Sequence, residues 1–467
     1  MKVIIRHILL LLCMVGASVA ARAEADCSLS ALQAIELPVM QINTVDSVMP
    51  TCDYVDHPPG CIGHSTTNAT KVPGRMVITM LADTLYDSGE YLDGESGMTI
   101  KITGNTSAFK DQKPYKIKLQ KKADLLMRGD PACMDREWRL LRDDRTFNTI
   151  VGLKVNELMG LQWTPRWQYC NVVINGEYQG LYLLIETVKR NRGCRLDVDK
   201  SGFIVERDAY WWNEERYFNT PFFDQRFAWT FKYPDGDEVT EEQQGYIQDY
   251  ITRAEQSIKL STYVRYIDVE SFASWLLAHD ILGTWDSGGS NLYVTKRDST
   301  DGSRLEMGCL WDFDSSREMG VNTFSRYHMM RDFYFVDLLE NKDATFRRAY
   351  RGKWDEVKAT LLSDIDGFVN GYAASMSRPI YQSRALTAQL YGYSVFTTYT
   401  SAIFQVDWMK KHLPELDEII SSIDISAIDD IRAEEAGDNR TFNLHGIEVP
   451  DDTRGLVIRN HRLVLQP

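Results

Sequence analysis

Positive charge is scarce in this sequence of 467 residues, which has 52 lysines and arginines against 66 aspartates and glutamates and a formal net charge of -14. Proteins that bind nucleic acid use lysine and arginine to neutralise phosphates. The acidic balance therefore argues against that class of partner. We expect no nucleic acid among the partners of this chain.

The apolar run at the N-terminus lacks the length to cross a bilayer comfortably. It follows Lys2 and Arg6, extends from Ile8 to Ala20 and ends in small residues near position 23. This pattern indicates a secretory signal peptide over residues 1–23 in preference to a membrane anchor. Its removal takes away three cations and no anion, which moves the net charge from -14 to -17. We expect a secreted, periplasmic or cell-surface protein without stable membrane insertion after cleavage.

Cysteine is also sparse, and seven of the eight cysteines, an odd number, remain after signal removal. Exported proteins form disulfides, and Cys52 and Cys61, separated by a Pro-Pro-Gly turn, are the pair that closes most easily. The sequence does not define the connectivity. A zinc site would need Cys52, His57, Cys61 and His64, whose spacing fits no zinc-finger pattern. We therefore favour a disulfide.

The composition, 44% hydrophobic and 11% aromatic, is that of a folded protein, and the length suggests two or three subdomains. Residues 24–75 are rich in turn-forming residues, with one apolar stretch at 37–42 that indicates an edge strand among loops. Alternating patterns then predict strands at 75–80, 98–103 and 113–119.

A helix and a hairpin follow. Apolar residues at helical spacing predict a helix over 144–159, with Asp143 or Asp144 as N-cap and Gly160 as C-cap. Residues 137–141 are apolar enough for a short strand or the start of a helix. The strands predicted at 169–174 and 180–185 are joined through Asn175-Gly176, which is a strong hairpin signal. Further helices are expected at 239–258 and 269–281, the second capped by Asp268.

Two lysines share one face of the strand at 113–119. Lys116 and Lys118 alternate with apolar residues, and the strand follows a small polar turn that contains Gly104 and Asn105. Such lysines can hold phosphate oxygens, although a solvated strand face has the same pattern. Glu157, in the predicted helix, is a candidate partner for a strand lysine or a solvent-exposed glutamate.

Two aspartates and one amide have the spacing that phosphoryl transfer requires. Asp286 and Asn291 are five positions apart, and Asp312 lies 21 residues further on, at the end of an apolar run. Phosphoryl transfer needs a carboxylate that orients the acceptor hydroxyl, an amide oxygen for metal and a carboxylate between metal and phosphates. Asp286-x-x-x-x-Asn291 matches a kinase catalytic loop, and Asp312 stands where Asp-Phe-Gly would begin. No glycine follows Phe313 and no His-Arg precedes Asp286, so the spacing alone has low specificity.

Longer blocks of sequence, in a consistent order, add specificity. Over roughly residues 35–420 the chain resembles the CotH family of secretory-pathway kinases, named for spore coat protein H. The resemblance rests on Ile102-Thr-Gly-Asn-Thr-Ser, Lys113-Pro-Tyr-Lys-Ile-Lys-Leu-Gln-Lys-Lys, Glu137-Trp-Arg-Leu-Leu, Val173-Ile-Asn-Gly-Glu-Tyr-Gln-Gly-Leu-Tyr-Leu-Leu-Ile-Glu, Lys232-Tyr-Pro-Asp, Ile267-Asp-Val-Glu-Ser-Phe and Leu310-Trp-Asp-Phe-Asp.

The resemblance implies an α+β fold of the atypical protein-kinase type with two lobes. We expect a small, mostly antiparallel β lobe with one helix at 76–190 and a larger, mostly helical lobe at 191–425. The implied activity is transfer of the γ-phosphate of ATP, with Mg²⁺ or Mn²⁺, to hydroxyl side chains of an exported protein substrate.

The implied roles fall on residues at the matching positions. The catalytic carboxylate is Asp286, and the metal ligands are Asn291 and Asp312. ATP would contact Lys116 or Lys118 and the turn at Gly104 and Asn105, with Glu186 near the adenine hinge.

Departures from the family pattern keep other functions open. Thr103-Gly-Asn replaces Arg-Gly-Asn, and Phe147-Asn-Thr replaces an Arg-Asn pair early in the helix. The alternative is a catalytically inactive kinase-like structural or binding protein of the cell envelope. A third option is transfer of another nucleotide moiety, such as AMP, from the same site.

Three features remain with two interpretations each. Aromatic residues crowd positions 211–231, as core or as a substrate groove. His279 and His328 are expected as surface or capping groups. The tail at 435–467 contains two short strands around a turn, as in a final hairpin of the fold, and is similar to the C-terminal sorting tails of many secreted Bacteroidetes proteins.

Overall fold

The computed structural model describes residues 26–81, 83–142, 146–222, 226–284, 286, 290–316, 334–392, 396–426, 441–442, 448–450, 455–459 and 462–466. The predicted signal peptide, the N-cap at Asp143 or Asp144, and His328 lie outside these residues. Within the described ranges, no helix combines the length and the apolar character that crossing a membrane requires.

The N-terminal half is built on one large sheet that closes on itself. Its order is β1-β9-β10-β8-β7-β6-β4-β5, and a further pairing of β1 with β4 joins seven of these strands into a barrel. The strands are β1 (Val39–Thr44), β4 (Val72–Met80), β5 (Asp83–Asp87), β6 (Met98–Ile102), β7 (Tyr115–Ala123), β8 (Asp135–Arg142), β9 (Trp167–Ile174) and β10 (Glu177–Glu186).

Alternation of apolar and polar residues fills this barrel. In β6 and in the first half of β7 every second residue is buried, as Ile100 and Ile117 show, and these side chains meet Trp138 and Val172 in one apolar cluster. The predicted strands at 75–80, 98–103 and 113–119 are confirmed. The hairpin is also confirmed, because Asn175 and Gly176 both have positive φ between β9 and β10.

The strand predicted at 37–42 is confirmed as β1, but its predicted position at the edge of a sheet is wrong. β1 pairs antiparallel with β4 and parallel with β9, so both of its edges are occupied. The fully buried Val39, Met40 and Ile42 fit a strand inside the sheet, but the pairing of its two edges depends on backbone contacts with distant strands that this local pattern does not show.

A second sheet and most of the helices follow. The sheet has the order β12-β13-β11-β14-β15 and is formed by β11 (Phe203–Asp208), β12 (Tyr217–Phe218), β13 (Ala228–Tyr233), β14 (Leu292–Lys296) and β15 (Leu305–Met307). The helices are α2 (Leu29–Gln33), α3 (Thr146–Met159), α4 (Glu241–Lys259), α5 (Val269–Leu282), α7 (Phe335–Glu340), α8 (Thr345–Val357), α9 (Leu361–Tyr391) and α10 (Phe396–Ser422). Asp268 caps α5 as expected, by accepting a hydrogen bond from the Ser271 N–H.

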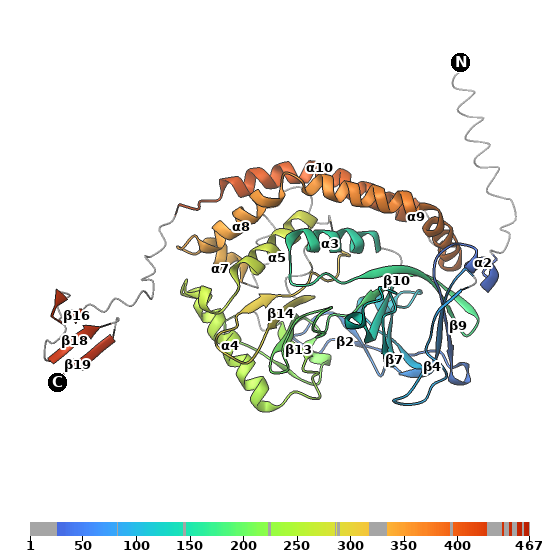
Figure 1. Cartoon of the computed structure of the whole chain (residues 1–467), viewed down its shortest axis with the longest axis horizontal. Helices are drawn as coiled ribbons and strands as arrows, with labels where there is room; N and C mark the ends of the chain where they lie inside the picture. Colours follow the sequence, from blue (N-terminus) through green and yellow to red (C-terminus); the bar gives the residue numbers. More distant parts are fainter. Residues whose placement is uncertain are drawn as a thin grey trace, which may run out of the picture.

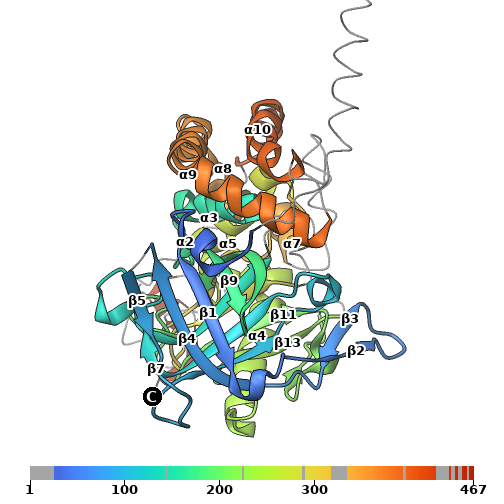
Figure 2. The same cartoon turned by 90° about the vertical axis from the view of Figure 1, so that its right-hand side faces the viewer.

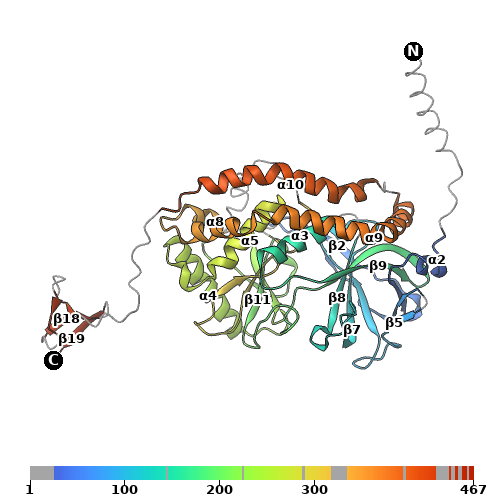
Figure 3. The same ribbon diagram turned by 45° about the horizontal axis from the view of Figure 1, so that its top comes forward.

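The α+β class is confirmed, but the division into a β lobe and a helical lobe needs correction. Figure 1 shows α3, α5, α8, α9 and α10 on one side of both sheets. Figure 3 shows α9 and α10 running side by side over this layer. The contact with the barrel is direct, because the Leu181 N–H in β10 donates to Thr387 Oγ1 in α9 (2.8 Å). The barrel therefore shares its helical cover with the second sheet.

The tail forms a small sheet in place of a single hairpin. Its order is β17-β16-β18-β19, from β16 (Thr441–Phe442), β17 (Glu448–Val449), β18 (Gly455–Arg459) and β19 (Arg462–Gln466). In the described residues these strands pair only with one another. The sorting function of residues 435–467 stays a prediction.

The expected disulfide between Cys52 and Cys61 is not formed. The hairpin of β2 (Asp53–Asp56) and β3 (His64–Thr67) places Cys52 before its first strand and Cys61 in its connecting loop, so the two lie at opposite ends. No group of three metal-binding side chains exists among the described residues, which include both histidines of the zinc alternative. The disulfide joins Cys133 to Cys194 instead.

Removal of this disulfide is expected to lower the free energy of unfolding by about 4 kcal/mol, because the bond closes a loop of 61 residues in the unfolded chain. Urea unfolding of Cys133→Ala, Cys194→Ala and the double variant would measure this. Cys61→Ala is the control, since Cys61 is unbonded. Equal stability of the wild type with and without reductant would contradict the prediction.

Candidate functional site

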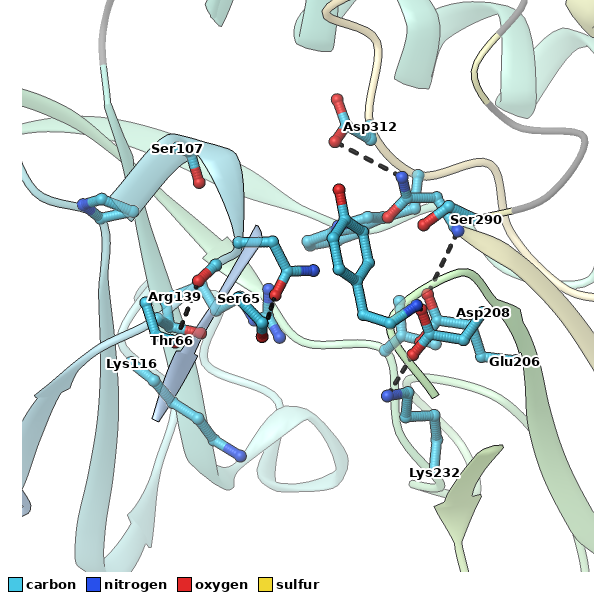
Figure 4. A pocket seen from close by; sticks show the side chains of 18 of the residues that line it. Ser65, Thr66, Ser107, Lys116, Arg139, Glu206, Asp208, Lys232, Ser290 and Asp312 are labelled. Atoms are coloured by element: carbon cyan, nitrogen blue, oxygen red, sulfur yellow. Dashed lines mark hydrogen bonds and ion pairs between the residues drawn. The ribbon is translucent and has the colours of Figure 1, made fainter. Parts of the chain in front are cut away.

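A cleft of about 1330 Å³ lies between the barrel and the second sheet. The barrel contributes basic side chains, among them Lys101, Lys116 and Arg139, whereas the opposite wall is mostly acidic. Figure 4 shows Lys116 and Arg139 on one side and Glu206, Asp208 and Asp312 on the other. The acidic wall comes from the ends of β11 and β13, from the start of β14 and from the segment that follows β15.

The two predicted metal ligands meet in this cleft. Asn291 Nδ2 and Asp312 Oδ2 are 3.5 Å apart, and both residues have left-handed backbone conformations, with φ of 59° and 63°. Such conformations are uncommon outside glycine and are maintained only where surrounding contacts enforce them. The Asp314 N–H also donates to Asp312 Oδ1 (3.2 Å). Asp286, Asn291 and Asp312 all line the same cavity.

Helix α3 holds the segment that carries Asp312. The fully buried Asn156 accepts a hydrogen bond from the Leu310 N–H (2.8 Å) and donates to the Trp163 carbonyl (2.9 Å). On the next turn of the helix, Gly152 faces Phe313 so closely that a Cβ atom at position 152 would fall within the space of the phenylalanine ring. Asp312 is therefore fixed from both sides by residues that dock on one helix.

Asn291 is held by a buried ion pair. Glu206 Oε1 accepts the Asn291 N–H (3.2 Å), and Glu206 Oε2 lies 2.8 Å from Lys232 Nζ. Glu206 is 6% exposed, so its charge needs this partner. Lys232 and Glu206 thus fix the backbone of the asparagine in its left-handed conformation.

Asp208 lies beside this pair and titrates near neutrality. Burial and the charge of Glu206 raise the pKa of Asp208, whereas the charge of Lys232 lowers it. The net result is a pKa of about 7, against an ordinary value of 3.8. The folded protein therefore binds this proton more tightly than the unfolded chain does. The contribution to stability is present at low pH and is lost as the pH rises through about 7.

Asp208→Asn should remove this dependence. Between pH 5 and pH 8 the free energy of unfolding of the wild type should fall, relative to that of the variant, by an amount on the order of a few kcal/mol. Urea unfolding of both proteins at the two pH values would measure the difference, and all other titrating groups are common to both. A difference that does not change with pH would contradict the assignment.

Of the two strand lysines, only Lys116 faces the cleft. Its Nζ lies 2.8 Å from Glu137 Oε2 in the neighbouring strand β8. Burial alone would raise the pKa of Glu137, but Lys116 and Lys189 outweigh it and lower the pKa to about 2.

Lys118 is exposed and does not line the cavity, because the part of β7 that borders the cleft stops at Lys116. Glu157 pairs with Lys154 (3.1 Å) and Arg166 (3.7 Å), so it is not the partner of a strand lysine.

The turn at Gly104 and Asn105 lines the cleft next to Lys116. Gly104 has a φ of 93°, a conformation that glycine adopts without strain. Asn105 precedes the short helix η3 (Thr106–Phe109) but makes no side-chain cap to it. The structure therefore brings Gly104, Asn105 and Lys116 onto one wall.

Asp286 enters the cleft directly after α5. Its N–H donates to Ser315 Oγ (3.4 Å), which ties it to the segment that carries Asp312. Two residues earlier, Thr284 Oγ1 lies 2.5 Å from Nδ1 of His279. The expectation of a surface histidine is wrong, because His279 is fully buried and burial lowers its pKa to about 3. A neutral His279 fixes the end of α5 before Asp286.

The side chain of Glu186 does not reach the cleft. It is fully buried in an ionic network with Arg128 (2.8 Å) and Arg195 (3.7 Å), and it accepts the Arg166 N–H (3.0 Å). Its neighbours Ile185, Thr187 and Val188 line the cavity instead. The structure thus brings this stretch of backbone to the cleft without the glutamate side chain.

The aromatic residues at 211–231 divide between core and cleft. Phe218, Trp229 and Phe231 are buried in the main apolar cluster. Phe231 also lines the cavity, as do Tyr210 and Phe227. The core interpretation therefore holds for Phe218, Trp229 and Phe231, whereas Tyr217 in β12 is exposed.

Comparison with protein families decides the membership of this chain. The family described as CotH kinase protein matches residues 100–415. The chain belongs to the CotH kinase family. No curated protein matches the sequence significantly. Among solved structures, the "Shewanella oneidensis MR-1 Toxin Antitoxin System HipA, HipB and its operator DNA complex" is similar with a TM-score of 0.25 and 10% identity, over 62% of this chain and 61% of that chain.

For a member of the CotH kinase family, the donor set in the cleft fits a magnesium-like ion. Asn291 and Asp312 offer one amide and one carboxylate at a shared point, and no group of three His, Cys, Asp or Glu side chains exists among the described residues. Mg²⁺ is ordinarily bound by one or two carboxylates together with water and substrate phosphates, whereas zinc needs a fuller set of protein ligands. The residues present therefore fit an ion of the Mg²⁺ type better than zinc.

Sequence reasoning missed three residues of this CotH site, Glu137, Glu206 and Lys232. Glu137 and Lys232 begin two of the blocks that carry the family resemblance. Glu206 ends an otherwise apolar strand, Gly202-Phe-Ile-Val-Glu206, and a charge in such a strand signals a buried partner. Their pairing depends on contacts between distant segments.

Proposed function

We propose that this protein is an exported phosphotransferase that moves the γ-phosphate of ATP to hydroxyl side chains of an exported protein, with Mg²⁺ or Mn²⁺. The observation that carries the proposal is the meeting of Asn291 and Asp312, both with left-handed backbone conformations, opposite the half-buried Lys116. In this proposal the barrel serves as the small lobe of a kinase-like fold and the second sheet with its helices as the large lobe. The pattern of residues 1–23 supports export.

The residues of the cleft divide the work of phosphoryl transfer. Asp286 orients the acceptor hydroxyl and accepts its proton. Lys116, held by Glu137, contacts phosphate oxygens, and the turn at Gly104 and Asn105 brings backbone groups close to them. Asn291 and Asp312 would hold the metal. When bound, the metal neutralises charge on the phosphates.

The adenine would lie against the backbone of residues 185–188. Ile185, Thr187 and Val188 line the cleft at the end of β10, whereas the Glu186 side chain lies in the ionic network with Arg128. The proposal therefore assigns a structural role to the Glu186 side chain and base contacts to its neighbours.

The alternative is an inactive kinase-like binding protein of the cell envelope. It is favoured by two departures from the family pattern, Thr103-Gly-Asn in place of Arg-Gly-Asn and Phe147-Asn-Thr in place of an Arg-Asn pair. Transfer of a nucleotide moiety is a further outcome of the same site.

Incubation of the protein with γ-labelled ATP, each metal in turn and casein as a general acceptor would test the proposal, together with its own autophosphorylation. We expect label on protein and a mass increase equal to one phosphoryl group or a multiple of it. A mass increase equal to AMP would indicate nucleotide transfer, and no modification with either metal would favour the inactive protein.

A further inference from the structure

The hairpin of β2 and β3 contacts both walls of the cleft. It precedes the matched family region and was expected to be loops. Figure 2 shows it on the flank of the molecule opposite β4 and β5. Several of its residues, including Ile62, Ser65 and Thr66, line the cavity. Their hydrogen bonds reach two segments that are distant in sequence.

The hairpin holds the turn at residues 104–108 at three points. Thr66 Oγ1 donates to the Gly104 carbonyl (3.1 Å), and Ser65 Oγ donates to Asn105 Oδ1 (2.9 Å). At the far end of the turn, the Tyr54 hydroxyl donates to the Ala108 carbonyl (2.7 Å). Figure 4 shows Ser65 and Thr66 on the wall that also carries Lys116 and Ser107.

The same hairpin is tied to the second wall through η6 (Trp211–Asn213). Asn213 Nδ2 donates to Ser65 Oγ (3.0 Å) and to the Thr66 carbonyl (2.8 Å). Trp212 Nε1 donates to the Ile62 carbonyl (3.3 Å). The Ser65 hydroxyl therefore donates to one wall and accepts from the other, and the side chain is 2% exposed.

Ser65 also determines what Asn105 does. An asparagine at the N-terminus of a helix ordinarily caps it with its side-chain oxygen. Asn105 occupies that position before η3 but makes no cap, and its Oδ1 accepts from Ser65 instead. Its backbone is also unusual, with φ of -97° and ψ of -98°.

We propose that Ser65 is a positioning residue for the nucleotide phosphates, because it fixes the turn at Gly104 and Asn105 and links it to Asn213 across the cleft. This inference rests on the proposed function. It makes the β2–β3 hairpin a part of the site that sets the shape of the phosphate-binding wall before ATP arrives.

Two variants test the inference, Ser65→Ala and Asn213→Ala. Asn213 is exposed, so we expect Asn213→Ala to fold. This variant keeps the test decisive if replacement of the buried Ser65 unfolds the protein. Asp56→Asn is the matched control, since Asp56 lies in the same hairpin and its exposed side chain pairs with His64 of the opposite strand, not with a residue of the turn. Hydrogen exchange of the 104–108 amides without nucleotide reports the turn itself. Steady-state kinetics or calorimetry with ATP and Mn²⁺ reports the nucleotide.

Loss of one such hydrogen bond should raise exchange at 104–108 and KM for ATP by about five- to tenfold each, with kcat within about twofold and the unfolding midpoint unchanged. Unchanged exchange in both variants, or raised exchange with unchanged KM, would overturn the inference. If the wild type itself binds no ATP with either metal, the proposed function fails. In that case, raised exchange in both variants would still support the part of the inference that the hairpin fixes the conformation of the turn.

Discussion

Replacing Asp312 with alanine is expected to lower phosphate transfer by at least about 10²-fold while the fold survives. The carboxylate lies beside Asn291 in the cleft, so its loss removes one of the two proposed metal ligands and leaves the amide of Asn291 as the other. The contacts that dock this segment on α3, through Leu310 and Phe313, do not involve the carboxylate, whereas the longer hydrogen bond from the Asp314 N–H (3.2 Å) does and is lost. The variant should therefore unfold at nearly the same urea concentration as the wild type.

Label transfer from γ-labelled ATP and urea unfolding, measured on the same preparations, would check this. Asp301→Asn serves as the control, because Asp301 lies in the exposed loop between β14 and β15 and outside the cleft. Transfer by Asp312→Ala at more than about a tenth of the wild-type rate would contradict the role of Asp312.

Gly152→Ala should lower both stability and activity although it adds only one methyl group. Alanine normally favours a helix over glycine by about 1 kcal/mol. At position 152, however, the added methyl would occupy the space of the Phe313 ring, and overpacking of this kind costs about 1–3 kcal/mol. Phe313 must move, and Asp312 moves with it. We expect lower stability and a loss of activity of at least about tenfold.

A compensating change distinguishes this mechanism from a general weakening of α3. Gly152→Ala combined with Phe313→Leu should recover part of both stability and activity, because the smaller side chain makes room for the methyl. Gly245→Ala is the matched control, since Gly245 lies in α4 with no atom within 4 Å of the added Cβ, and it should be stabilising. If Gly152→Ala and Gly245→Ala have the same stability and activity, the close packing of Phe313 on Gly152 does not position Asp312.

Local patterns in the sequence predicted most of the barrel strands and helix α3. Alternation at 98–119 and the Asn175-Gly176 turn depend on neighbouring residues only, so they are readable without a structure. Closure of the barrel was not readable, because it depends on β1 pairing with β4 and β9, more than 100 residues away in the second case. The same limit applies to the disulfide, whose cysteines are 61 residues apart.

The candidate site divides in the same way. Asp286, Asn291 and Asp312 were found because a motif spacing and a family resemblance both point to them, and the structure brings them to one cleft. Lys118 was a candidate because alternation in the sequence shows that it shares a strand face with Lys116. The sequence does not show how far along the strand the cleft extends. Glu137, Glu206 and Ser65 act through partners in other strands or loops, and no local pattern identifies such partners.

Calorimetry of ATP binding tests the central claim most directly, because the cleft is proposed to hold a nucleotide through a metal at Asn291 and Asp312. The account predicts saturable heat when ATP is added to the wild-type protein with Mg²⁺ or Mn²⁺. It predicts no such heat without metal or with Asp312→Ala. No heat from the wild type with either metal, or equal affinity in Asp312→Ala, would contradict it.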